Sequence, residues 1–366
     1  MADLEKEEIM NEEIYQRLAE HLDQFPGGFV YTDSGVELRM LKLLFTPEEA
    51  ELAIYLTLDR EAARSIADRA GMPQSETEQR LAEMAHKGLI FSVHPKDGPP
   101  LYQAVPFILG IYEFQVNNLN ADLLKELADY MATKKPQPQT IQQMRTIPVG
   151  KSIEPHIEAL PYEQVDELIN AQNYFAVGPC ICRRRATMMG DGCDAPEESC
   201  LFFGEWAEFH VRDGRARPIE RSEVTEILAM ADAANLVLQP NNSQDMVFLC
   251  CCCGCCCGVL KRLQKHPNPS RIVASAFINT LKPEVCQGCW TCLERCQMQA
   301  LSKEGDRIAL NLERCIGCGL CVTTCSSGAL ALIRRTDKEH SRIPVNMDAT
   351  WRAIVQAQVM GRDGVK

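Results

Sequence analysis

Apolar and polar positions in the first third of the chain follow a helical period that later changes to alternation. Residues 46–58 predict a capped helix, with a threonine N-cap and a proline at the first helical position. Two more helices are expected over residues 60–70 and 75–87, because a glycine follows each. Residues 89–105 alternate and turn at an Asp-Gly pair. The pattern therefore predicts three helices followed by a hairpin.

A polar, proline-broken stretch in residues 134–146 predicts a linker to a second region of mixed structure. Beyond it, the apolar pattern predicts helices and strands in alternation. The expected elements are a strand at 145–149, a helix at 161–172, a strand at 174–178, a helix at 222–234 and a strand at 236–238. The middle of the chain is therefore expected to be α+β.

Three helices followed by a hairpin is the element order of a winged helix-turn-helix, and residues 40–105 resemble that family. In the third expected helix, Glu76, Glu78 and Glu83 stand against Arg80 and Lys87. Such a helix would repel a nucleic-acid duplex, because phosphate contacts supply most non-specific affinity. We therefore expect this domain to dock a partner or form a dimer, and nucleic acid is a disfavoured partner.

Charge and hydropathy narrow the class of protein further. The 366 residues include 38 Lys and Arg against 50 Asp and Glu, a formal charge of −12 that suits contact with basic partners. The acidic N-terminus lacks the apolar core of a signal peptide. No run approaches the roughly 20 apolar residues that cross a bilayer. The sequence therefore predicts no membrane span and a cytoplasmic location.

All 19 cysteines lie between Cys180 and Cys325. In a reducing compartment such crowded thiols would be oxidised unless a metal held them. A disulfide scaffold is the competing interpretation, but it is typical of small secreted chains. Metal binding is therefore the expected role of the cysteines.

Eight of the cysteines form two runs with the spacing Cys-x2-Cys-x2-Cys-x3-Cys. The runs are 29 residues apart and comprise Cys286, Cys289, Cys292 and Cys296, then Cys315, Cys318, Cys321 and Cys325. A cubane needs four thiolates at tetrahedral corners, and a loop with two-residue gaps can supply three of them. The fourth ligand must come from elsewhere. Two such runs in tandem are a highly specific pattern.

Residues 280–340 resemble the bacterial two-cluster 4Fe-4S ferredoxins, in which the last cysteine of each run binds the other cluster. The resemblance implies two ligand sets: Cys286, Cys289, Cys292 and Cys325, and Cys315, Cys318, Cys321 and Cys296. Gln297 and Ser326 stand where the family usually has proline. Gly288, Gly317 and Gly319 are expected to let backbone amides approach the sulfides.

Eleven further cysteines precede these runs, more than two additional cubanes would need. Three arginines, Arg183, Arg184 and Arg185, follow the first pair directly and are candidate cofactor-binding residues, because positive charge lowers thiol pKa and offsets cluster charge. Adjacent cysteines on a strand point to opposite faces, so the tract 250–257 cannot serve one cubane alone.

Residues 147–281 are also similar to a poorly characterised family of ferredoxin-type proteins from anaerobes, with a CxCR element and a cysteine tract. Cys251 departs from that pattern and is the weakest candidate. The resemblance favours at least one additional iron–sulfur centre, with zinc as an alternative. The candidate ligands are Cys180, Cys182, Cys193, Cys200, Cys250, Cys252, Cys253, Cys255, Cys256 and Cys257.

The fold expected from these observations is an α+β multidomain chain. Its parts are an acidic helical N-terminus (1–35), a winged-helix-like domain (36–133), a linker (134–146), a cysteine-rich α+β middle domain (147–280), a two-cluster 4Fe-4S ferredoxin-like domain (281–345) and a C-terminal tail (346–366). The segment 149–152 mimics the end of a phosphate loop, but Arg145 occupies the position of the required glycine.

The leading hypothesis for function is an electron-transfer protein or redox subunit that carries two 4Fe-4S clusters and meets redox partner proteins. One alternative is a redox-sensing transcriptional regulator that uses the winged-helix-like domain. Another is a reductase with a catalytic cluster in the middle domain. An electron carrier or oxidoreductase subunit is favoured over a stand-alone enzyme, and no residue is assigned a catalytic role.

Overall fold

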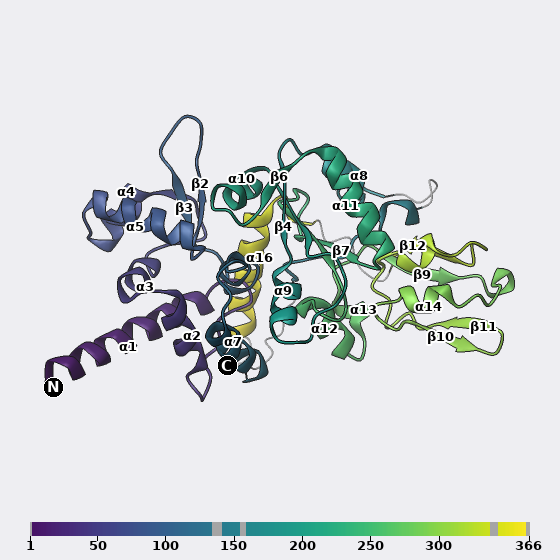
Figure 1. Ribbon diagram of the computed structural model, residues 1–366, viewed down its shortest axis with the longest axis horizontal. Helices are drawn as coiled ribbons and strands as arrows, with labels where there is room; N and C mark the ends of the chain where they lie inside the picture. The colour runs from purple at the N-terminus through teal and green to yellow at the C-terminus, as the bar shows by residue number, and fades with distance from the viewer. Residues whose placement is uncertain (1, 134–140, 154–158, 337–342, 364–366) are drawn as a thin grey trace. The chain divides into compact units, whose positions relative to one another are not determined.

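The computed structural model describes residues 2–133, 141–153, 159–336 and 343–363 (Figure 1). The chain divides into two compact units, an N-terminal unit of residues 1–139 with 351–366 and a cysteine-rich unit of residues 140–350. Much of the expected linker, 134–140, lies outside the described residues. Among the helices of the described ranges, none combines the length and the apolar character that crossing a bilayer requires.

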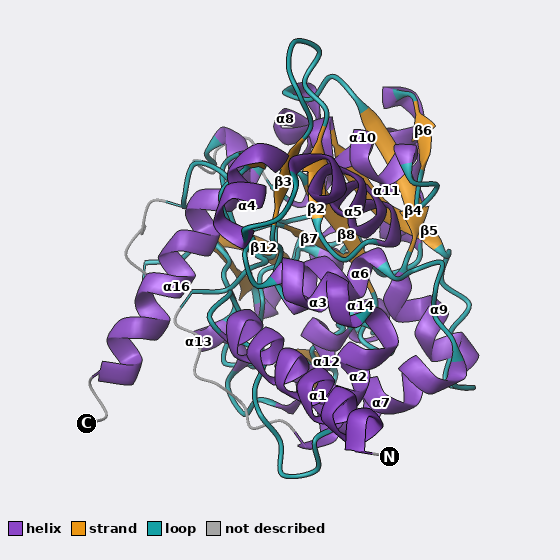
Figure 2. Ribbon diagram, turned by 90° about the vertical axis from the view of Figure 1, so that its left-hand side faces the viewer, coloured by secondary structure: helices purple, strands orange, loops and turns teal. Residues whose placement is uncertain are grey.

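The N-terminal unit is mainly helical (Figure 2). A capping box starts α3: Thr46 Oγ1 accepts a hydrogen bond from Glu49 N–H at 3.3 Å, and Glu49 Oε2 accepts one from Thr46 N–H at 2.9 Å. Three short strands form an antiparallel sheet in the order β1-β3-β2. The elements are α1 (Ala2–Asp23), α2 (Val36–Leu44), α3 (Pro47–Ala53), β1 (Glu61–Ala62), α4 (Ala63–Ala70), α5 (Gln74–Lys87), β2 (Phe91–Val93), β3 (Leu101–Gln103), η1 (Phe107–Ile111), α6 (Tyr112–Phe114), α7 (Ala121–Thr133) and α16 (Met347–Asp363), of which the last continues from the other unit.

This element order agrees with the expected three helices and hairpin. Helices α4 and α5 end at Gly71 and Gly88, both in the left-handed conformation that glycine tolerates. The hairpin is formed by β2 and β3, which pair with Phe91 opposite Gln103. Membership of the winged-helix family stays a prediction.

The cysteine-rich unit is built on a five-stranded antiparallel sheet in the order β6-β4-β5-β8-β7. Its strands are β4 (Phe175–Pro179), β5 (Glu198–Phe203), β6 (Arg217–Ile219), β7 (Val237–Pro240) and β8 (Phe248–Cys252). Its helical elements are η2 (Gly150–Ser152), η3 (Pro161–Glu163), α8 (Val165–Asn170), α9 (Ile181–Met188), α10 (Gly204–Arg212), α11 (Arg221–Ala233), α12 (Gly258–Lys265) and α13 (Pro269–Ile272).

The two faces of this sheet carry different side chains. On one face, Phe202 and Phe248 pack against Trp206 and His210 of α10. On the other, apolar residues such as Leu201 share a core with Val224 and its neighbours in α11. Because strand residues alternate between faces, this pattern fixes where each cysteine of β5 and β8 points.

The last part of the unit is a pair of similar halves. Strand β9 (Phe277–Leu281) pairs with β12 (Leu330–Arg334), and β10 (Leu301–Glu304) pairs with β11 (Arg307–Leu310). Two short helices, α14 (Thr291–Arg295) and α15 (Leu320–Thr323), pack together, and η4 (Pro283–Val285) precedes the first cysteine run. The expected mixture of helices and strands in this part of the chain is therefore confirmed.

The ferredoxin-like part and the five-stranded sheet share one hydrophobic core. Met298, Ile316 and Leu320 belong to the same buried cluster as the residues of the sheet. The segment that mimics a phosphate loop contributes to this contact, because Val149 N–H donates a hydrogen bond to the carbonyl oxygen of Cys318 at 3.1 Å. The segment 149–152 is thus a packing element in the structure.

Candidate metal centres

The first group of four thiols draws on both cysteine runs. Cys286 follows η4, Cys292 lies in α14, and Cys325 follows α15. Burial, and then the nearby thiols of Cys289, Cys325 and Cys286, raise the pKa of Cys292 to about 11. The other three thiols therefore lie near enough to Cys292 to affect its ionisation, and Cys286 and Cys325 pack against the same small core. This is the ligand set that the ferredoxin resemblance implies for one cubane.

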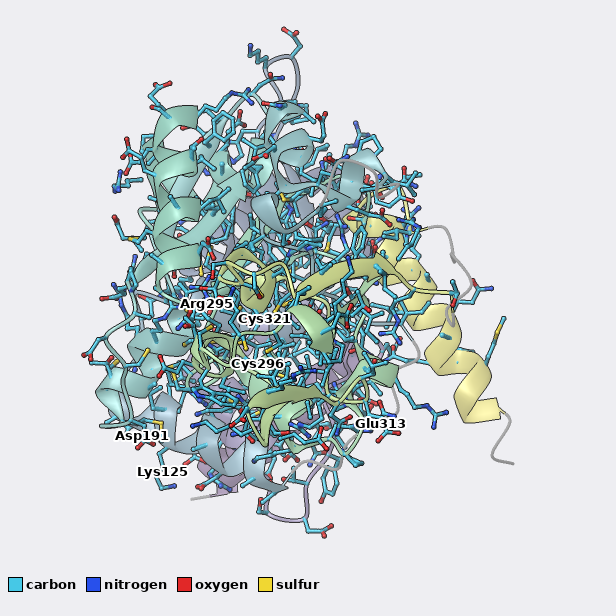
Figure 3. The ribbon with its side chains drawn as sticks, turned by 90° about the vertical axis from the view of Figure 1, so that its right-hand side faces the viewer. Lys125, Asp191, Arg295, Cys296, Glu313 and Cys321 are labelled. Atoms are coloured by element: carbon cyan, nitrogen blue, oxygen red, sulfur yellow. The ribbon has the colours of Figure 1, made fainter. Side chains whose placement is uncertain are left out.

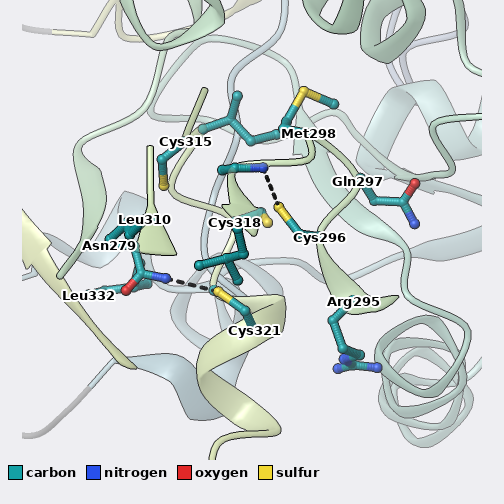
Figure 4. Close-up of a pocket in the computed structure, with 14 residues that line it drawn as sticks. Asn279, Arg295, Cys296, Gln297, Met298, Leu310, Cys315, Cys318, Cys321 and Leu332 are labelled. Carbon is teal, nitrogen blue, oxygen red and sulfur yellow. Dashed lines mark hydrogen bonds between the residues drawn. The ribbon is translucent and has the colours of Figure 1, made fainter. Parts of the chain in front are cut away.

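The second group of thiols lines a single small pocket (Figure 4). Cys296 enters from the first run and Cys315, Cys318 and Cys321 from the second. Burial, together with the thiols of Cys296 and Cys315, raises the pKa of Cys318 to about 12. A thiolate here is costly alone, whereas a metal ion supplies the opposing charge. The pocket thus has the ligands and the environment of a metal site.

Hydrogen-bond donors surround the sulfurs of this second group. Asn279 Nδ2 donates to Cys321 Sγ at 2.9 Å, and Ala300 N–H donates to Cys296 Sγ at 3.2 Å. Arg295 lies beside Cys296 and Cys321 and donates through Nε to the carbonyl oxygen of Leu320 at 3.1 Å (Figure 3). Donors to thiolate sulfur favour the more negative state of a cluster and raise its reduction potential.

Two glycines of the second run are required by close packing. Gly317 has φ +72°, and a Cβ there would lie 2.1 Å from the carbonyl oxygen of Phe277. Gly319 has φ +77°, and its Cβ would lie 2.1 Å from Ser152 Oγ. Side chains at these positions would push β9 and the segment 149–152 away from the cysteine loop.

Four middle cysteines converge into what we call the four-thiol site, formed by Cys193, Cys253, Cys255 and Cys256. Their sulfurs all lie within 4.8 Å of one another. The Cys193 sulfur is 3.8 Å from that of Cys253 and 3.6 Å from that of Cys256. Four cysteines in this arrangement suit a cubane or a single zinc ion.

The other six candidate ligands form a second group of neighbouring thiols, which we call the six-thiol ring. Each thiol in the ring has two others as its nearest interacting thiols. In order around the ring, the residues are Cys180, Cys182, Cys257, Cys252, Cys250 and Cys200. The structure therefore separates the ten middle candidates into a group of four and a group of six.

Cys251 lies apart from both groups. Its neighbours Cys250 and Cys252 share one face of β8, so Cys251 points to the other face, where it is 1% exposed in the apolar core. Burial, and then the neighbouring Cys250, raise the pKa of Cys251 to about 12. This position agrees with its standing as the weakest candidate ligand.

The three candidate arginines occupy different surroundings. Arg183 is 2% exposed, donates to the carbonyl oxygens of Pro196 and Cys251 at 2.7 Å each, and hydrogen-bonds to the Cys253 thiol. Arg184 is partly exposed and pairs with Glu197 at 2.7 Å. Arg185 lies half-buried near the end of α9. Only the first of them therefore lies among the thiols.

Sequence reasoning did not identify Asn279 or Gln239 as residues of these sites. Gln239 Oε1 accepts a hydrogen bond from Cys257 Sγ at 3.8 Å. Neither residue lies near a cysteine in the sequence, and strand pairing brings each into place. The sequence did mark Gln297 as unusual, because it replaces the usual proline after the fourth cysteine. Its contacts could not be predicted from the sequence.

Comparison with known proteins agrees with the C-terminal geometry. Residues 285–329 match the family model of a 4Fe-4S dicluster domain. Searches of curated proteins and of solved structures give no significant match. The chain therefore carries a 4Fe-4S dicluster domain, which together with the cysteine-rich region suggests electron transfer.

Proposed function

We propose that the chain is an iron–sulfur electron-transfer protein or redox subunit with three centres on one path. Two cubanes occupy the ligand sets of the dicluster domain, and a third iron–sulfur centre occupies the four-thiol site. Each cubane changes its charge by one electron at a time. Electrons enter at one end of this path and leave at the other, toward redox partner proteins.

A hydrogen bond between the two cysteine-rich segments carries the proposal. Gln297 directly follows Cys296, and its Oε1 accepts a hydrogen bond from Gly254 N–H at 2.9 Å. Gly254 stands between Cys253 and Cys255 of the four-thiol site. One side chain thus joins the backbone next to a ligand of the dicluster domain to the backbone next to two ligands of the middle site.

The same glutamine is fixed by its other contacts. Its Nε2 donates to the carbonyl oxygen of Asn235 at 2.8 Å, and its own carbonyl oxygen accepts from Gln264 Nε2 at 2.9 Å. A Cβ at Gly254 would lie 2.3 Å from Gln264 Nε2 and 2.7 Å from Gln297 Oε1, so a larger residue would displace these two side chains. Proline at position 297 would remove the hydrogen bonds that the glutamine side chain makes. These hydrogen bonds account for the departure from the ferredoxin pattern at this position.

The N-terminal unit is proposed to dock a redox partner. The arginine and the lysine of α5 both pair with glutamates: Arg80 lies 3.0 Å from Glu76 and Lys87 lies 2.6 Å from Glu49. Glu78 and Glu83 are exposed on the same helix. This acidic face favours a basic protein over the phosphates of DNA.

Anoxic reduction tests the proposed function. Purified protein treated with dithionite should bleach and develop the EPR signals of interacting reduced cubanes. Cys193→Ala should then remove about four irons and leave the signals of the dicluster domain unchanged. Colourless protein, or a chromophore that dithionite does not change, would overturn the proposal.

The path between the centres is tested by Gln297→Leu, which keeps the side-chain volume and removes both side-chain hydrogen bonds. After flash reduction of the dicluster domain, electron arrival at the four-thiol site should slow several-fold. The matched control is Gln287→Leu, because Gln287 also follows a cluster cysteine but is exposed. Equal transfer rates in the two variants would refute the path.

A further inference from the structure

The six-thiol ring begins with the register of two strands. Cys200 of β5 is directly opposite Cys250 of β8. Cys252 lies two residues further along β8, so its side chain emerges on the same face. Gln239, which contacts the Cys257 thiol, is opposite Cys250 on the other side of β8. Backbone pairing alone therefore gathers three of the six thiols, with Cys257 next to them.

Two helix ends close the ring. Cys180 is the N-cap of α9 and Cys257 is the N-cap of α12. The N–H of Arg183 donates to the Cys180 sulfur, and the N–H groups of Val259 and Leu260 donate to the Cys257 sulfur. Helix N-termini stabilise negative charge, so these two positions suit the negative charge of a thiolate-ligated cluster.

A buried positive charge lies beside the ring. Within the described part of the chain, the hydrogen-bond partners of Arg183 are carbonyl oxygens, the Ser199 hydroxyl and the Cys253 thiol, with no carboxylate among them. Its Nε is buried without a hydrogen-bond partner in those residues. Cys180 and Cys252 of the ring lie close enough to interact with its charge. A buried guanidinium is stabilised by a nearby anion, and a thiolate-ligated cluster in the ring would supply that negative charge.

We propose that the six-thiol ring binds one iron–sulfur cluster that contains more than four irons and is separate from the four-thiol site. A single cubane or a zinc ion takes four cysteine ligands, which would leave two of the six unused. Each thiol has two ring neighbours, so no set of four stands apart from the rest. The strand pairing, the helix ends and the buried charge all converge on the ring as a whole.

The experiment uses the full chain with anoxic iron and sulfide quantitation and Mössbauer spectroscopy. The two cubanes and the four-thiol site account for about twelve irons, so the wild type should contain more than about sixteen. Cys250→Ala/Cys252→Ala should lose more than four irons and keep the dicluster EPR signals. Cys251→Ala is the matched control on the same strand and should lose none.

Each other outcome contradicts the inference. A loss of about four irons would mean one cubane with two unused thiols. Zinc that disappears with the double substitution would mean a zinc–thiolate site. Far-UV circular dichroism like that of the wild type shows that the variant has folded. A wrong assignment of the four-thiol site can be told apart from a wrong assignment of the ring. It would show as unchanged iron content in Cys193→Ala, whereas the ring variant would still lose iron.

Discussion

Arg183 places a positive charge where thiolate sulfur is the only balancing anion among its described partners. Arg183→Gln keeps a polar side chain but removes the charge, so both middle groups of thiols should hold metal less well. Residues that support metal ligands typically contribute 10–100-fold in affinity. We expect iron extraction by an anoxic chelator to be faster by about that factor, followed by absorbance of the chelate.

The matched control for this prediction is Arg184→Gln. Arg184 has the same charge and the same helix but lies partly exposed, paired with Glu197. Its replacement should leave the extraction rate close to that of the wild type. If the two variants lose iron equally fast, the effect of Arg183 is general destabilisation of α9 and not charge balance at the sulfurs.

His210 predicts a pH dependence that does not involve the cysteines. It is 2% exposed and stacks on Phe202 with ring centroids 3.8 Å apart. Burial, and then the charge of Arg215, hold the pKa of His210 well below its usual 6.5. Below pH 6.5 the unfolded chain therefore binds a proton that the folded state excludes, and stability falls by up to about 1.4 kcal/mol per pH unit.

Anoxic urea unfolding at pH 7.5 and pH 5.5 measures this effect. His210→Leu should show a smaller loss of unfolding free energy over the same interval, because its unfolded state has one fewer proton to bind. Acid effects on the clusters are common to both proteins and cancel in the comparison. An identical loss in the two proteins would show that His210 is protonated in the folded state.

At the scale of elements, the turns of the cysteine loops predict which glycines are essential. Gly317 and Gly328 both have positive φ, +72° and +67°, so an alanine at either costs about 1 kcal/mol in backbone conformation. Only Gly317 also faces a backbone oxygen, that of Phe277. Gly317→Ala should displace the loop and remove about four irons, whereas Gly328→Ala should retain them.

Iron quantitation and EPR spectra of the two alanine variants check this prediction. The first ligand set provides an internal reference, because the displaced loop holds only Cys315, Cys318 and Cys321 of the second. Retention of all iron in Gly317→Ala would mean that β9 yields to the new methyl group. Loss of iron in both variants would mean that positive φ, and not the close approach, is what the loop requires.

Elements with local signals could be predicted from the sequence, and those without could not. Helix α3 has its capping box and α5 its terminal glycine, so both were expected near their observed positions. Strands β5 and β8 were missed because cysteines interrupt their apolar alternation. Their stability comes from pairing with β4 and β7, which is a tertiary effect.

For the metal sites too, ligands that are close in sequence could be predicted, and ligands brought together by tertiary structure could not. The repeated spacing revealed the cysteines of the dicluster domain, since the ligands of each loop are close in sequence. Alternation along β8 separates Cys251 from Cys250 and Cys252, whereas residues 253–257 lie beyond the end of the strand. The partner of each half, Cys193 for one and Cys200 for the other, depends on the pairing of β5 with β8 and on loops that no local pattern specifies.

At the scale of the whole molecule, charge is unevenly distributed along the chain. The N-terminal unit, residues 1–139 with 351–366, contains 25 Asp and Glu against 16 Lys and Arg, so its net charge is −9 of the chain's −12. The cysteine-rich unit is close to neutral before clusters are counted. The N-terminal unit is therefore the main source of long-range attraction for a basic partner.

This charge distribution predicts that the rate of electron transfer to a cationic oxidant falls with salt concentration and that the rate to an anionic oxidant does not. Reduced protein should transfer electrons to a cationic haem protein such as cytochrome c on the order of tenfold more slowly at about 0.5 M salt than at about 0.01 M, since screening shortens the Debye length from roughly 30 Å to a few ångströms. The rate of electron transfer to ferricyanide, an anion, should not fall.

Substituting Glu78 and Glu83 by Gln should weaken the salt dependence of the cytochrome c rate and leave the ferricyanide rate unchanged. Those carboxylates lie on the proposed docking face and not at a cluster. Stopped-flow absorbance measures both rates. If the rate with cytochrome c does not change with salt concentration, charge attraction does not drive partner docking.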